Sequence, residues 1–126
     1  MFISDRRFKL WDCRVSHNQL LIRSPATPEI PSNIDVIFWG VEFVSMPTTL
    51  NGLAIERRSD GKDIGIPISP SPNGERFLIQ SDGKCFAVVA AGFKVLENSL
   101  DIFDSSLEGF AATQAGRDLG NVLAHS

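Results

Sequence analysis

Asp12, Ser16 and His17 are the residues whose types come closest to a catalytic set in this sequence. A serine, a histidine and a carboxylate can act as nucleophile, base and orienting group when their side chains are within hydrogen-bonding distance. Neighbouring residues on a strand point to opposite faces, so closeness in sequence does not supply that geometry. We expect His17 to be a polar turn residue. A small enzyme that uses His17 with Asp12 or Glu42 is the least favoured of three functional hypotheses.

The residue types and their spacing do not match known patterns for binding a metal or a cofactor. Cys13 and Cys85 lie far apart and, with His17 and His125, do not match the ligand spacing of a zinc site. The aspartates are scattered among turns without a calcium-loop pattern, and no glycine-rich phosphate loop is present. We therefore expect no metal and no cofactor, and both cysteines as small buried hydrophobes.

Three charged residues interrupt apolar runs: Asp12, Glu42 and Lys94. A buried charge without a partner is very costly, so each must be paired, neutralised or exposed. The simplest expectation is that a strand end or a sheet edge lets them reach water. The alternative is that Glu42 or Asp12 faces a cavity or a subunit interface. A Glu42–Lys94 ion pair can form if the two longest apolar runs are neighbours.

A small-ligand-binding β-barrel is the second functional hypothesis. Its interior would be lined by Phe38, Phe86 and Phe93, with Glu42 or Asp12 holding a polar group of the ligand. The chain contains nine phenylalanines and no tyrosine. Tyrosine is common on binding surfaces because it adds a hydrogen bond to its ring area, so its absence suggests that the rings mostly fill the core.

Two apolar runs, residues 34–46 and 85–96, provide the framework that must position these side chains. The first is apolar on both faces, which is typical of a strand covered on each side. In the second, the small residues Ala87, Ala90, Ala91 and Gly92 indicate that another element packs closely over the strand. Shorter runs predict further strands at 7–15, 20–23, 50–57 and 77–80.

Polar turn residues separate these strands. Residues 16–19 predict a hairpin loop, and Asp82-Gly83 predicts a type I′ turn, because both residue types tolerate positive φ. Prolines place residues 24–33 and 63–76 in exposed connections, since proline cannot donate to a sheet.

The chain divides into a β-rich domain, residues 1–104, and a segment of different character, residues 105–126. Ser105 and Glu108 have the spacing of a capping box, but glycines oppose a helix after them. We expect either a short helix or a flexible tail there. The fold class is mainly β: an antiparallel rolled sheet of six to eight strands, as a small barrel or sandwich. An α+β fold is the alternative.

Composition narrows the remaining function classes. The net charge of −3 and the isolated basic pairs Arg6-Arg7 and Arg57-Arg58 argue against nucleic-acid binding. No apolar run is long enough to span a membrane, and the N-terminus lacks a signal-peptide pattern, so we expect a cytoplasmic protein. The leading hypothesis is a non-enzymatic interaction module that binds protein and self-associates as a homo-oligomer. Long apolar strands in so small a chain can leave one face that needs a partner.

Overall fold

The computed structural model describes residues 1–59, 66–102, 104–107 and 121–126. They form one antiparallel sheet of nine strands in the order β4-β7-β6-β5-β1-β2-β3-β8-β9. The fold class is therefore mainly β, as predicted, with more strands than expected and without closure into a barrel. The elements are β1 (Phe2–Arg14), η1 (Val15–His17), β2 (Gln19–Ser24), β3 (Asn33–Trp39), β4 (Phe43–Ser45), β5 (Thr49–Arg58), β6 (Glu75–Ser81), β7 (Lys84–Ala90), β8 (Gly92–Asn98) and β9 (Asn121–His125).

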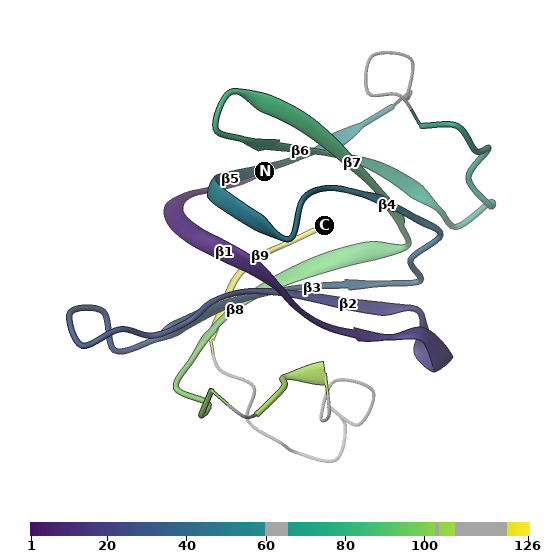
Figure 1. Cartoon of the computed structure of the whole chain (residues 1–126). Coiled ribbons are helices and arrows are strands. Elements are labelled where there is room, and N and C mark those ends of the chain that lie inside the picture. The colour runs from purple at the N-terminus through teal and green to yellow at the C-terminus, as the bar shows by residue number, and fades with distance from the viewer. Residues whose placement is uncertain (60–65, 103, 108–120) are drawn as a thin grey trace.

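The sheet rolls over so that two layers face each other (Figure 1). Strand β1 belongs to both layers: residues 2–9 pair with β5, and residues 9–14 pair with β2. Register shifts between Ser4 and Arg7, and again between Leu10 and Asp12, interrupt its ladders. Bulges of this kind bend a strand and increase its twist, which lets one long strand pass from one layer to the other.

A second corner lies where β3 continues into β4 and β7 continues into β8. Backbone hydrogen bonds follow the ladder around this corner: Ala91 N–H donates to the Trp39 carbonyl, and Glu42 N–H donates to the Val89 carbonyl. Gly40 has φ of +60°, and a Cβ there would lie 2.7 Å from the Ala91 Cβ. Each of the two long predicted strands is thus split by a bend. The predicted close packing at the small residues is confirmed at Ala91.

Phenylalanine rings fill the space between the layers. Phe38, Phe77 and Phe93 are buried, and their ring centroids lie 5.3 to 5.8 Å apart. Aromatic pairs at such separations and tilted angles add to the stabilisation that burial alone provides. Phenylalanine rings therefore fill part of the core, as the absence of tyrosine suggested.

Both predicted hairpin turns are confirmed. Between β1 and β2, Asn18 follows η1 and has φ of 50°. Between β6 and β7, Asp82 and Gly83 have φ of 52° and 74°. Positive φ at both central residues is the geometry that a type I′ turn requires.

The last described residues differ from the expectation of a helix or tail. Residues 121–125 form strand β9, which pairs with β8. Ala124 lies opposite Val95 and packs against the core, so tertiary contact supports a strand that the preceding glycines do not predict. Glu108 and the rest of residues 108–120 lie outside the described residues. No described helix is long, which leaves the α+β alternative unsupported, and none could cross a membrane.

Candidate functional site

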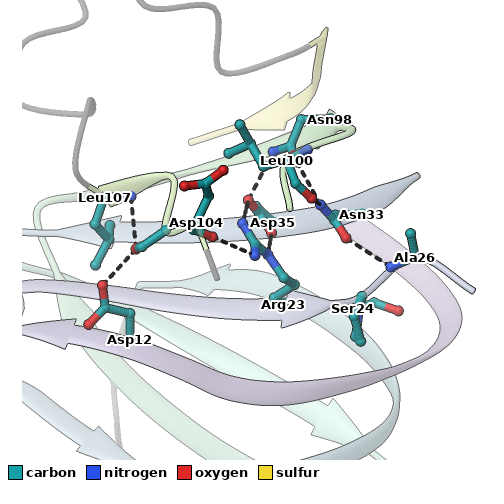
Figure 2. Close-up of polar contacts among 12 residues, drawn as sticks. Asp12, Arg23, Ser24, Ala26, Asn33, Asp35, Asn98, Leu100, Asp104 and Leu107 are labelled. Atoms are coloured by element: carbon teal, nitrogen blue, oxygen red, sulfur yellow. Dashed lines mark hydrogen bonds and ion pairs between the residues drawn. The ribbon is translucent and has the colours of Figure 1, made fainter. Parts of the chain in front are cut away.

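A buried ion pair lies on the outer face of β2 and β3. Arg23 donates from Nε to Asp35 Oδ1 at 2.6 Å and from Nη2 to Asp35 Oδ2 at 2.9 Å, and neither side chain is exposed (Figure 2). The ring of Trp11 lies over the guanidinium, 5.3 Å from its carbon. Bidentate Arg–carboxylate pairs are strong and directional, which suits a site that must hold fixed geometry without water.

Residues 98–102 and 104–107, called the strap below, cover this ion pair (Figure 2). Arg23 Nη1 donates to the Asp104 carbonyl at 2.8 Å, and Asn98 Nδ2 donates to Asp35 at 2.9 Å. Asn33 Nδ2 donates to the Asn98 side chain and to the Leu100 carbonyl. These bonds give partners to the buried side chains of Arg23, Asp35 and Asn98 and fix the strap to the sheet.

A small apolar cluster completes the contact between strap and sheet. Leu107 packs with the buried residues Leu21, Ile37 and Leu96. These three point away from the phenylalanine core, so β2, β3 and β8 are covered on both faces. The prediction that the first long apolar run is covered on each side is confirmed for β3.

Asp12 is an anchor of the strap. Its carboxylate accepts hydrogen bonds from Ser105 Oγ at 2.6 Å, Arg14 Nε at 2.9 Å and the Cys13 N–H at 2.8 Å. Burial alone would raise the pKa of Asp12, but the hydrogen bonds from Ser105, Arg14 and Cys13 outweigh burial and lower it. The side chain therefore holds the strap as a carboxylate.

Glu42 is exposed at the corner between β3 and β4. It accepts hydrogen bonds from the Ser71 hydroxyl at 2.7 Å and from the Ser71 N–H at 2.9 Å. These bonds lower the pKa of Glu42. Glu42 thus ties the proline-rich connection before β6 to the corner. It forms no ion pair with Lys94 in the described part of the chain.

The candidate ligand-binding residues are only partly brought together. Phe38 and Phe93 contact each other in the core, and Phe86 packs against the same core from a half-buried position. Phe86 also lines a surface cavity of about 300 Å³ with Thr49 and Asn51. Asp12 and Glu42 have their partners elsewhere, so they do not join the three rings into one ligand site.

The remaining candidates for chemistry lie on the surface. His17 ends η1 and is exposed in the turn, as expected. Cys13 and Cys85 are also exposed and free, so the expectation that both are buried is wrong. Cys13 follows the bulge at residues 10–12, and Cys85 lies on the outer side of β7 opposite exposed Gln80. Within the described ranges, no three His, Cys, Asp or Glu side chains form a metal-binding group.

A basic groove, which the sequence analysis missed, lies between β1 and the connection of residues 25–32. This connection, called the arm, projects from the body in Figure 1. The groove encloses about 330 Å³ and is lined by Arg6, Arg7, Lys9, Ser24, Pro25, Thr27 and Ile30. The Arg6-Arg7 pair was its only sequence signal. The arm's place beside β1 depends on pairing between distant segments.

Strand β9 forms a different surface, at one end of the sheet. Val122 and Leu123 are 51% and 45% exposed. The strand contains no lysine, arginine, aspartate, glutamate or proline. It is therefore an apolar edge without the residues that commonly protect edges.

No family model matches the chain, and no curated protein or solved structure is significantly similar to it.

Proposed function

We propose that the chain is a protein-interaction module that forms a homodimer by pairing β9 with β9 of a second copy. The observation that carries this proposal is the position of β9 as the last strand of the sheet, with exposed Val122 and Leu123. An edge strand presents a row of backbone donors and acceptors to another strand. Added apolar contact makes pairing with a partner more favourable than leaving the edge in water.

The other end of the sheet offers a contrast. Strand β4 has only three residues, and Glu42 and Pro47 flank it. Short length, charge and proline all discourage strand addition. Strand β9 has five residues and lacks such protection. Of the two edge strands, β9 is therefore better suited than β4 to pair with another strand.

The chemistry of β9 favours a second copy as the partner. A two-fold axis brings the same patch of both chains together, so a strand with like charges would repel itself. The sequence Asn-Val-Leu-Ala-His of residues 121–125 has no such charges when the histidine is neutral. Antiparallel pairing about Leu123 places the apolar side chains of the two copies next to each other.

The cytoplasm is the location that we propose for this dimer. Cys13 and Cys85 are exposed free thiols. A reducing compartment keeps such thiols from forming disulfides between chains.

Sedimentation across a wide concentration range tests the dimer. We expect the wild type to dimerise and Leu123→Lys to remain monomeric with an unchanged circular dichroism spectrum, because lysine places like charges at the two-fold axis. Val15→Lys is the matched control, since Val15 is 80% exposed and lies in η1, away from β9. A wild type that stays monomeric, or a Leu123→Lys dimer as tight as the Val15→Lys dimer, would refute the proposal.

A further inference from the structure

We propose that the basic groove between β1 and the arm binds an extended acidic peptide in which carboxylate side chains alternate with apolar ones. The groove is separate from β9, so this binding does not depend on the dimer. Arg6, Arg7 and Lys9 supply its charge, and Pro25 and Ile30 supply apolar surface.

Charge is the first argument for an acidic partner. Arg6, Arg7 and Lys9 line one groove, and none of them forms an ion pair with a carboxylate in the described part of the chain. The whole chain carries a net charge of −3, so the charge of the groove is opposite in sign to that of the chain as a whole. A cleft lined by one sign of charge concentrates ligands of the other sign.

The spacing of the cations favours an extended chain over a compact anion. Arg7 and Lys9 pair in regular register with Asn51 and Thr49 of β5, so their side chains leave the same face of β1. Residues two apart on a strand are separated by roughly 7 Å. Carboxylates at alternate positions of an extended peptide have this same repeat, whereas one small anion reaches only one such cation well.

Apolar surface in the groove is the reason for expecting apolar side chains in the peptide. Ile30 is 43% exposed and lines the groove with Pro25. An exposed isoleucine beside cations suits a ligand that buries an apolar side chain while its carboxylates remain near water. A phosphate polymer offers charge without that apolar side chain.

Hydrogen bonds hold the walls of the groove in place without a ligand. Arg6 donates to the Ser24 hydroxyl and to the Ser24, Pro25 and Ser32 carbonyls, which holds both ends of the arm. At the arm's tip, Thr27 and Ile30 exchange backbone hydrogen bonds of 2.7 and 3.2 Å. A preformed site loses less conformational freedom when its ligand binds.

Fluorescence anisotropy with a labelled peptide of alternating glutamate and leucine tests the groove. We expect saturable binding that weakens about tenfold in Lys9→Glu and in Arg7→Glu, because each variant replaces attraction by repulsion. Ile30→Ser weakens binding through the lost apolar contact. Lys84→Glu is the matched control: it makes the same charge change on an exposed lysine outside the groove, and we expect unchanged affinity.

Two further probes separate the acidic peptide from other occupants. A peptide of alternating glutamine and leucine keeps the shape without the charge, and oligodeoxythymidylate supplies charge without leucine side chains. The proposal fails if either probe binds as tightly as the acidic peptide, if the acidic peptide does not bind, or if Lys9→Glu and Lys84→Glu bind it equally. The same measurements in Leu123→Lys, which leaves the groove intact, distinguish failure of the groove from failure of the dimer.

Discussion

Arg23 and Asp35 face each other on neighbouring strands and join through two hydrogen bonds while both side chains are fully buried. The antiparallel pairing of β2 with β3 places the two residues directly opposite each other. The pair also holds the strap through the Asp104 carbonyl and the Asn98 side chain. One ion pair thus connects the sheet to a segment far along the chain.

Breaking the ion pair between Arg23 and Asp35 is expected to destabilise the fold strongly. Arg23→Met or Asp35→Leu alone should lower the free energy of unfolding by about 3–5 kcal/mol, because each leaves a buried charge without its partner. The double variant should recover most of that loss, though Asn98 still loses its acceptor. Urea denaturation of the three variants measures the coupling. A double variant as unstable as the sum of the singles would contradict this account.

Gly40 should be the most sensitive glycine at the corner. Gly40→Ala adds a Cβ 2.7 Å from the Ala91 Cβ at a residue with φ of +60°. The two effects together should cost roughly 2–4 kcal/mol. Gly83→Ala has a similar φ but open space around its Cβ, so about 1–2 kcal/mol is expected. Thermal unfolding compares them, and Ala91→Gly should partly rescue Gly40→Ala. No rescue would show that the clash is not the cause.

Acid should weaken the attachment of the strap through Asp12. The hydrogen bonds to its carboxylate hold the pKa of Asp12 below the unfolded value of 3.8. Its contribution to stability is therefore fully present above the unfolded pKa and is lost as the pH falls through the folded one. In Asp12→Asn, the difference in urea midpoint between pH 7 and pH 3 should be smaller than in the wild type. Asp5→Asn removes an exposed carboxylate that forms no hydrogen bond or ion pair within the described part of the chain, so it should keep the wild-type difference.

Arg6 should control the mobility of the arm. Arg6→Ala removes the hydrogen bonds to Ser24, Pro25 and Ser32. A glutamate-specific protease should then cut after Glu29 at least about fivefold faster, since each lost bond is worth about 1 kcal/mol. Arg7→Ala leaves the arm's hydrogen bonds intact and serves as the control. Equal cleavage rates in the two variants would show that Arg6 does not hold the arm.

Much of the fold could be predicted from local pattern. Alternating and doubly apolar runs predicted the antiparallel strands, and Asp82-Gly83 predicted its turn, because pleat periodicity and positive φ are properties of neighbouring residues. The roles of Asp12 and Glu42 could be predicted only as a choice between exposure and pairing. The sequence does not reveal Ser105 and Ser71 as their partners, since these lie far along the chain.

The sequence by itself determined a β-rich chain with a phenylalanine core, because side-chain type and period decide which faces avoid water. Only the tertiary structure decided where the long strands bend, that residues 121–125 add a ninth strand, and that Arg6, Arg7 and Lys9 share a groove with Ile30. Those features depend on contacts between distant segments. Local preference carries no information about which distant residue will be the partner.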